Sequence, residues 1–197
     1  QNLLHIYPHL KDLALRGSEN PDLRPGGSTT VRIHSVGGWG AMTMGKNLTL
    51  TLFELLGMHV KSNPKYGSEK KGQPTTFYGV FAHEPIRMNC ELKHVDVVLS
   101  NVGVGFFGPF EEVDLEKANR CFEINVTGTA AVLQAFLPSM ITRGFGRLVN
   151  VSSGYGSFAG GLVDAPPAYG ISKAAMNALT VVLDRAVPAD RDVLVNA

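Results

Sequence analysis

The stretch VNVSSGYGSFAGGLVDAPPAYGISKAAMNAL, residues 149–179, decides the fold of this 197-residue chain. Its first residues belong to RLVNVS (residues 147–152), which starts two residues earlier. This apolar, β-branched run predicts a buried strand. A glycine-rich loop follows, and a helix is predicted over residues 168–186, after a pair of prolines. A buried strand, a loop and a helix in this order form the repeating unit of a parallel α/β sheet.

The same unit recurs along the rest of the chain. Residues 95–100 (VDVVLS) are apolar on both faces, which is typical of a central, parallel strand. We therefore predict an α/β fold of Rossmann-like, three-layer, doubly wound type, with a mostly parallel sheet and helices on both faces. The predicted strands are residues 31–36, 58–64, 75–82, 95–100, 147–152 and 192–196, and the predicted helices are residues 41–56, 114–143 and 168–186.

The domain organisation follows from composition. Residues 1–30 contain an apolar helix candidate (residues 3–15) and then SENPDLRPGGS, so we interpret them as an N-terminal extension and linker. Residues 31–197 are predicted to form a single Rossmann-like domain. The chain lacks an initial methionine and stops after the apolar run VLVNA, so we expect a fragment or an engineered chain.

Charge and cysteine content exclude several classes of protein. With 44% hydrophobic and 18% charged residues and a net charge of +1, the chain is predicted to be globular and to bind no nucleic acid. No apolar run reaches the ~20 residues that span a bilayer, so we expect no membrane partner. Cys90 and Cys121 have no metal-ligand spacing, nor do the histidines; we expect free thiols, no metal site and a cytoplasmic location.

Tyr169 and Lys173 are four residues apart in a predicted helix and therefore lie on one face. Such a pair can move a proton to or from a carbonyl or alcohol oxygen. A free tyrosine has a pKa of about 10, too high for a base at neutral pH, and a neighbouring ammonium favours the phenolate. The spacing alone is weak support, because Tyr-x-x-x-Lys is frequent on solvated helices.

Two serines strengthen this interpretation. Ser152 and Ser153 end the strand that precedes the helix of Tyr169, so all three are expected at the carboxyl edge of the sheet, where ligands bind. A serine hydroxyl there can donate to the same substrate oxygen. The alternative is that the pair only caps the strand and its loop.

Three further polar or small residues are candidates. Asn125 lies inside the long helix between apolar residues, and a buried asparagine needs partners. It either binds a backbone carbonyl or holds a water in a proton relay to Lys173. Asn101 and Gly103 follow the central strand, where a glycine lets the backbone approach a cofactor.

A glycine turn follows the first strand of the domain. Gly38 and Gly40, with Thr43, give G-x-G-x-x-T, one glycine short of the dinucleotide fingerprint. The turn can aim helix N–H groups at a phosphate. No acidic residue ends the second predicted strand to hold an adenine ribose, and Asn63 is the nearest polar candidate.

Four ordered motifs over residues 95–197 resemble the short-chain dehydrogenase/reductases: VDVVLSNVGV, EINVTGT, RLVNVSSGYG and AYGISKAA. The resemblance implies NAD- or NADP-dependent interconversion of a carbonyl and an alcohol on a small molecule. It also implies a homo-oligomer, because members of that family commonly pair through the two long helices, here those that contain Asn125 and Tyr169.

The resemblance implies a role for each candidate. Tyr169 would be the general acid/base, and Lys173 would make its phenol more acidic and bind the nicotinamide ribose. Ser153 would position the substrate oxygen, with Ser152 and Ser157 as alternatives. The remaining expectations are that Asn125 supports the relay and that the cofactor is bound by Gly38, Gly40, Asn101, Gly103, Tyr169 and Lys173.

The first half departs from that family. The phosphate turn Thr-Gly-x-x-x-Gly-x-Gly is absent, and Ser100–Gly103 replaces Asn-Asn-Ala-Gly. Residues 31–100 instead resemble the gamma domain of 2-oxoacid (pyruvate/2-oxoglutarate):ferredoxin oxidoreductases, through VRIHSVGGWGAMTMGKN and NPKYGSEKKGQPTTFYGVFAHEPIRMNCELKHVDVVLS, and the leader within residues 1–30 fits that domain too. In those enzymes the domain serves assembly and covers the active site. We interpret the chain as a chimera of these two halves, and a non-catalytic assembly module or a fragment of such an oxidoreductase is the alternative function.

Overall fold

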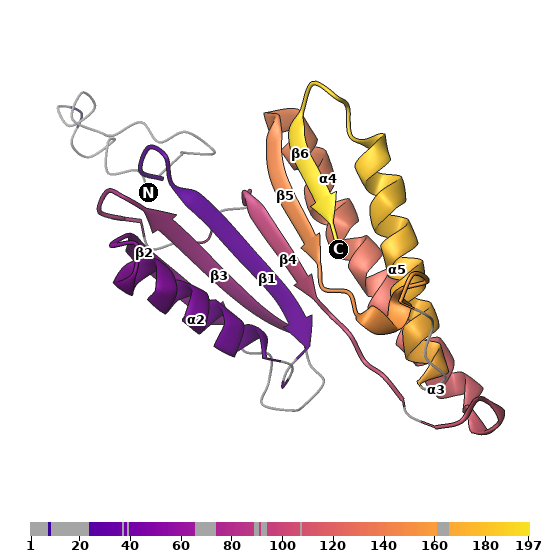
Figure 1. Cartoon of the computed structure of the whole chain (residues 1–197). Helices are drawn as coiled ribbons and strands as arrows, with labels where there is room; N and C mark the ends of the chain where they lie inside the picture. Colours follow the sequence, from indigo (N-terminus) through magenta and orange to yellow (C-terminus); the bar gives the residue numbers. More distant parts are fainter. Residues whose placement is uncertain are drawn as a thin grey trace.

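The computed structural model describes residues 8, 24–36, 38, 40–65, 74–88, 91, 94–106, 108–160 and 166–197, so the helix predicted at residues 3–15 lies, apart from Pro8, outside the described residues. The described residues contain a six-stranded sheet of order β2-β3-β1-β4-β5-β6 (Figure 1). Its strands are β1 (Thr29–Val36), β2 (His59–Lys65), β3 (Pro74–Ala82), β4 (Val97–Asn101), β5 (Phe145–Asn150) and β6 (Asp192–Asn196). Each predicted strand of the domain is therefore present.

The direction of the strands divides the sheet. The pairs β1·β4, β4·β5 and β5·β6 are parallel, whereas β1·β3 and β2·β3 are antiparallel. The prediction of a mostly parallel sheet is confirmed, but the β2–β3 hairpin is an exception. Residues 66–73 are the whole connection between β2 and β3, and a parallel crossover needs a dozen residues or more.

The helices cover both faces of the sheet, as predicted (Figure 1). Helix α2 (Ala41–Glu54) packs on β1 and β3 through a core that includes Ile33 and Phe77. Helices α4 (Thr129–Arg143) and α5 (Pro167–Ala186) lie on the opposite face. That second core is formed by apolar side chains of β3, β4, β5, β6 and α4, with α5 packed against it.

The long helix predicted over residues 114–143 has three parts. Asp114 caps α3 (Leu115–Phe122), accepting from the amides of Glu116 and Lys117, and a π-helical turn, η3 (Glu123–Gly128), joins α3 to α4. By length and composition alone, the continuous helical stretch Leu115–Arg143 could cross a membrane, whereas the sequence alone predicted no apolar run long enough. Within the structure its α4 part packs Leu133 and Met140 into the core, as the helix of an α/β layer does.

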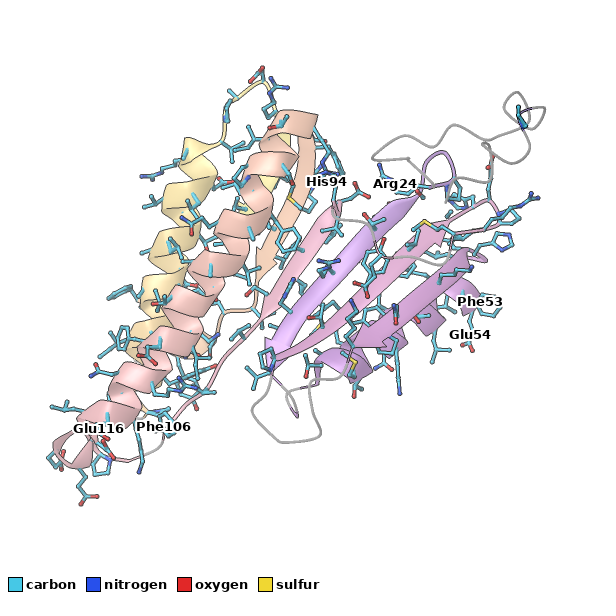
Figure 2. The ribbon with its side chains drawn as sticks, turned by 180° about the vertical axis from the view of Figure 1, so that it is seen from behind. Arg24, Phe53, Glu54, His94, Phe106 and Glu116 are labelled. Atoms are coloured by element: carbon cyan, nitrogen blue, oxygen red, sulfur yellow. The ribbon has the colours of Figure 1, made fainter. Side chains whose placement is uncertain are left out.

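An ionic cluster around the buried Asp96 joins the two halves of the chain at the amino-terminal end of β4. Arg24 Nη1 contacts both carboxylate oxygens of Asp96, at 3.1 and 3.0 Å, and the Thr30 amide and hydroxyl donate to Asp96 Oδ2 at 2.8 and 2.7 Å. Arg143, at the end of α4, lies 3.7 Å from the same carboxylate. Figure 2 labels Arg24 and His94 at this end of the sheet, and Phe106 and Glu116 at the opposite end.

Candidate functional site

Helix α5 carries Tyr169 and Lys173 at the edge where β4 and β5 end. Pro167 occupies the first turn of α5, where the missing N–H is not needed. The Lys173 side chain is 2% exposed, and its ammonium donates to the carbonyls of Val102 at 3.2 Å and Val151 at 2.8 Å. The ammonium also lies 5.7 Å from the centre of the Tyr169 ring. Lys173 is therefore held in place by the residues that directly follow β4 and β5, with Tyr169 beside it.

Burial changes the acidity of this lysine. Removal from water lowers the pKa of Lys173 to about 8, and the nearby Cys121 acts in the opposite direction. An ammonium has three protons to donate, and the two carbonyls take two of them. Lys173 therefore has one more proton to donate to a ligand. Its ammonium also begins to lose its charge at a pH that is only slightly above neutral.

The loop after β4 lies against this pair. A Cβ added at Gly103 would stand 3.2 Å from Lys173 Nζ, and one added at Gly105 would stand 3.3 Å from the Tyr169 ring. Both glycines therefore let the backbone approach the pair closely. Gly103 was expected from the sequence, whereas Gly105 was not, although the spacing Gly103-Val104-Gly105 was a signal for it.

Asn125 is fully buried in the π-helical turn and fixes that loop. Its Oδ1 accepts from the Val104 amide at 2.8 Å, and its Nδ2 donates to the Val104 carbonyl at 2.9 Å and to Ser172 Oγ at 2.8 Å. Of the two interpretations, the described contacts match the backbone-bound asparagine. Its role in a proton relay stays a prediction, and π-helical turns are frequent at functional sites.

Cys121 lies beside Asn125 and Ser172 and is a free, buried thiol. It donates to the Val104 carbonyl at 3.0 Å. Burial raises the pKa of this thiol, so it stays protonated at neutral pH. Cys90, the other cysteine, lies outside the described residues.

The serine strand ends in a short 3₁₀ turn, η4 (Gly154–Gly156), capped by Ser153. Ser153 Oγ accepts from the Tyr155 amide at 3.3 Å, and a hydroxyl that accepts in this way can still donate its own proton. The other two serines are engaged elsewhere. Ser152 Oγ donates to Asn177 Oδ1, and Ser157 Oγ accepts from the Gly160 amide at 3.1 Å. Ser152 thus already donates its proton, whereas Ser153 and Ser157 both keep theirs, and the choice of Ser153 stays a prediction.

The turn is docked on α5 by backbone contact. A Cβ added at Gly156 would stand 2.7 Å from the Ala174 amide, and one added at Gly170 would stand 3.0 Å from the Tyr155 carbonyl. The rings of Tyr155 and Tyr169 meet edge to face, 6.1 Å apart. The structure thus brings the serine turn onto the turns of α5 that carry Tyr169 and Lys173.

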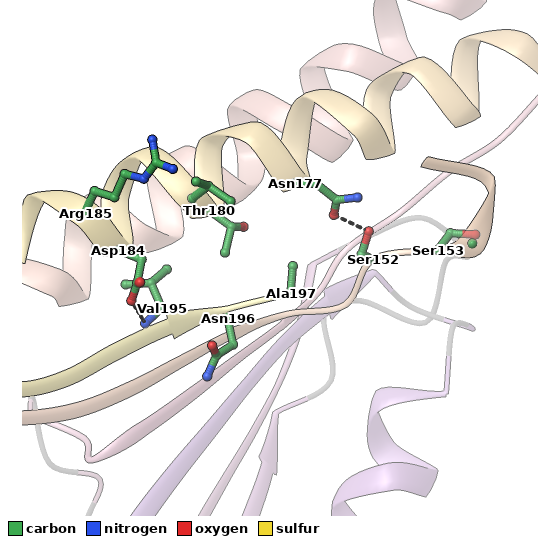
Figure 3. A pocket seen from close by; sticks show the side chains of 11 residues that line it. Ser152, Ser153, Asn177, Thr180, Asp184, Arg185, Val195, Asn196 and Ala197 are labelled. Carbon is green, nitrogen blue, oxygen red and sulfur yellow. Dashed lines mark hydrogen bonds between the residues drawn. The ribbon is translucent and has the colours of Figure 1, made fainter. Parts of the chain in front are cut away.

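An open groove of about 660 Å³ extends from Ser153 between α5 and the end of β6 (Figure 3). Asp184 lines it and accepts from the Val195 amide at 3.2 Å, which joins α5 to β6. Tyr169 and Lys173 are not among its lining residues, which are Ser152, Ser153, Gly154, Asn177, Thr180, Val181, Asp184, Arg185, Val195, Asn196 and Ala197.

The predicted phosphate turn lies at the end of β1. Gly38 and Gly40 have positive φ angles of 90° and 81°, and a Cβ added at either would meet no atom of the described residues within 4 Å, chain neighbours aside. Gly40 caps α2, whose first turn has no acidic side chain. None of the contacts described for these glycines reaches Tyr169 or Lys173. Asn101 is joined to β1 instead, because Ser35 Oγ donates to its carbonyl at 2.7 Å.

Asn63, the proposed ribose contact, is not next to this turn. It lies on β2, and β3 separates β2 from β1. Its side-chain Nδ2 donates a hydrogen bond to Glu91 Oε1 at 3.1 Å.

Comparison with known protein families accounts for both halves. Residues 86–197 match the short chain dehydrogenase family, and residues 30–102 match the pyruvate ferredoxin/flavodoxin oxidoreductase family. Because the first match covers more than half of the 197 residues, this chain belongs to the short-chain dehydrogenase family.

Individual relatives share only part of this chain. Human 17-beta-hydroxysteroid dehydrogenase type 1 is 39% identical over 87 residues, which are 43% of this chain and 25% of the human protein. A xylitol dehydrogenase solved with NAD⁺ is 35% identical over 53% of this chain and 39% of its own, with a TM-score of 0.48. A 3-oxoacyl (acyl-carrier-protein) reductase of Agrobacterium tumefaciens, solved with NADP, is 24% identical over 51% of this chain and 38% of its own, with a TM-score of 0.47. The chain thus spans about a quarter of the length of the curated relative.

Proposed function

We propose that this chain carries the catalytic part of an NAD- or NADP-dependent oxidoreductase that interconverts a carbonyl and an alcohol on a small molecule. The observation that carries the proposal is the buried Lys173 ammonium, bound to the ends of β4 and β5 one helical turn from Tyr169. A lysine that only decorated a solvated helix would be exposed.

The residues around this lysine fit the nicotinamide end of such a cofactor. Lys173 has a proton left to donate to a ribose hydroxyl, and Gly103 leaves the backbone bare beside it. At the other end, the positive φ angles of Gly38 and Gly40 and the uncharged first turn of α2 suit a phosphate. When bound, the nicotinamide supplies the hydride acceptor or donor.

The side chains then divide the proton chemistry. In the reduction direction Tyr169 gives its phenolic proton to the substrate oxygen as the carbonyl becomes an alcohol. Ser153 donates a hydrogen bond to the same oxygen, which stabilises the charge that develops there. Lys173 stabilises the phenolate that remains, and Asn125 keeps the loop after β4 in place beside the pair. Oxidation follows the same steps in reverse.

The alternative is a non-catalytic assembly module, and the match of residues 30–102 to the pyruvate oxidoreductase family favours it. In that case the site would be a remnant of ancestry. The strand order also favours the assembly module. In dinucleotide-binding folds an acidic residue at the end of the second strand binds the ribose, and here β3 separates the end of β2 from the glycine turn after β1.

Cofactor titration separates the two functions. NADH and NADPH would be titrated by fluorescence, and a panel of aldehydes assayed with the wild type and with Tyr169→Phe. The proposal predicts binding of at least one cofactor below millimolar concentration and turnover that Tyr169→Phe removes. Binding of neither cofactor at millimolar concentration would overturn the enzyme, and binding with unchanged turnover in Tyr169→Phe would overturn the mechanism.

A further inference from the structure

Asn177 makes two hydrogen bonds to the ends of the turn that carries Ser153. Ser152 Oγ donates to Asn177 Oδ1, as Figure 3 shows, and Asn177 Nδ2 donates to the Gly156 carbonyl at 3.3 Å. A side-chain amide is suited to this task because it offers an acceptor and donors on one planar group. The two partners flank Ser153 along the chain, one just before it and the other three residues after it.

We propose that Asn177 is the positioning residue for Ser153. It holds both ends of the turn 152–156 against α5, so that the Ser153 hydroxyl keeps its orientation at the site. Asn177 follows Lys173 by four residues and Tyr169 by eight, so one face of α5 carries all three. The consequence for catalysis rests on the function proposed above, whereas the hold on the turn does not.

The rest of the turn shows why a side-chain clamp matters. Ser153 has an extended backbone, with φ −154° and ψ 147°, and the turn closes through the Gly156 amide, which donates to the Ser153 carbonyl at 3.0 Å. Gly154 is exposed, and a Cβ added there would meet no atom of the described residues within 4 Å, so none of these residues packs against the tip. Backbone contact restrains the turn at Gly156 and at the Tyr155 carbonyl, and the two bonds of Asn177 are the side-chain hydrogen bonds that join it to α5 among the described residues.

Amide hydrogen exchange tests the clamp without any assay of activity. In Asn177→Ala the amides of Tyr155, Gly156 and Ser157, whose hydrogen bonds lie within the turn, are expected to exchange at least tenfold faster. Ser152→Ala removes one of the two hydrogen bonds and should give a smaller increase in the exchange rate. Combined with Asn177→Ala, it should add little to the effect of Asn177→Ala alone. Asn119→Ala, at an exposed asparagine on α3, is the matched control and should leave these amides unchanged.

Kinetics test the consequence for the reaction. Asn177→Ala is expected to lower kcat about tenfold while the KM for the cofactor changes less than twofold, since the Lys173 contacts are intact. Asn177→Asp keeps the acceptor for Ser152 and should restore part of kcat. A merely structural role would lower the amount of folded enzyme and leave kcat per folded molecule unchanged.

The outcomes separate the two proposals. Unchanged exchange in Asn177→Ala overturns the role of Asn177, whatever the activity, and faster exchange with unchanged kcat overturns its effect on Ser153. If the wild type binds neither cofactor, the proposed function fails, while faster exchange in Asn177→Ala still supports the clamp.

Discussion

The two regions of this sheet use its carboxyl edge differently. In the parallel region, β4 to β6 with α3 to α5, side chains from the helices bind the backbone at the strand ends, as Lys173 does at Val102 and Val151. In the region of β1, β3 and β2, with α2, the edge has a glycine turn in which no described side chain packs on Gly38 or Gly40. The antiparallel β3 begins at that edge between β1 and β2.

The difference teaches where this fold can place chemistry. Neighbouring parallel strands all end at one edge, so their loops and the helices that follow converge there. An antiparallel strand sends its following loop to the opposite edge. Since β1 is parallel to β4, its glycine turn reaches the same edge, whereas the loop after β3 does not. The proposed function places proton transfer in the region of β4 to β6 and phosphate binding at the glycine turn, and four variants test that division.

The largest expected effect is at the join between the two regions. Asp96→Ala removes the carboxylate that Arg24, Thr30 and Arg143 share, and is expected to lower the free energy of unfolding by ~3 kcal/mol, because the buried Thr30 and the half-buried Arg24 lose their hydrogen bonds. Urea unfolding measures it. If the loss were below ~1 kcal/mol, the two regions would not depend on this cluster.

A second variant affects only the region of α2. A Cβ at Gly45 would stand 2.4 Å from the ring of Phe77, which is fully buried. Gly45→Ala is expected to destabilise the protein by ~2 kcal/mol through overpacking, despite the better helix propensity of alanine. Urea unfolding and the kcat of the remaining folded enzyme give the check. A large loss of kcat per folded molecule would contradict the division of roles.

A third prediction concerns pH and the parallel region. The pKa of Lys173 is about 8 in the folded protein against an ordinary 10.5, so the unfolded chain binds more protons between those values. Stability should therefore rise with pH in this window, by about 1 kcal/mol per pH unit, in the wild type relative to Lys173→Met. Urea unfolding of both proteins at pH 7, 8, 9 and 10 measures the difference. A difference that stays flat above pH 8 would mean that the ammonium is not buried.

The smallest effect is expected at an exposed pair within the parallel region. Arg147 and Asp192 join β5 to β6 at 2.8 Å, but the Asp192 side chain is 63% exposed. Asp192→Ala is therefore expected to change the free energy of unfolding by less than ~0.5 kcal/mol. This variant is the surface counterpart of Asp96→Ala. A loss as large as that at Asp96 would show that burial does not govern these ion pairs.

Local patterns in the sequence predicted most of the fold. The residues of β6 are identical to those predicted, and α5 differs by one residue at its start, because apolar patterning and proline place these ends. The antiparallel hairpin was not predicted, since a strand pattern carries no direction. The short connection of residues 66–73 could have revealed it.

Sequence alone predicted less of the candidate site. Spacing on a helix identified Tyr169 and Lys173, because neighbours four residues apart need no tertiary information. Asn177 and Gly156 were missed, because their partners lie 21 or more residues away or in the backbone. Ser172 was missed for the same reason, since its bond to Asn125 spans 47 residues.

The most direct test of the central claim compares two neighbouring tyrosines whose rings lie 6.1 Å apart. With an aldehyde substrate and saturating reduced cofactor, Tyr169→Phe should lower the rate of a single turnover by about 1000-fold, which is the typical contribution of a general acid to the rate. Tyr155→Phe, at the exposed ring, should lower it by less than roughly threefold, since no proton passes through it. Equal rates in the two variants would contradict the assignment of proton transfer to Tyr169.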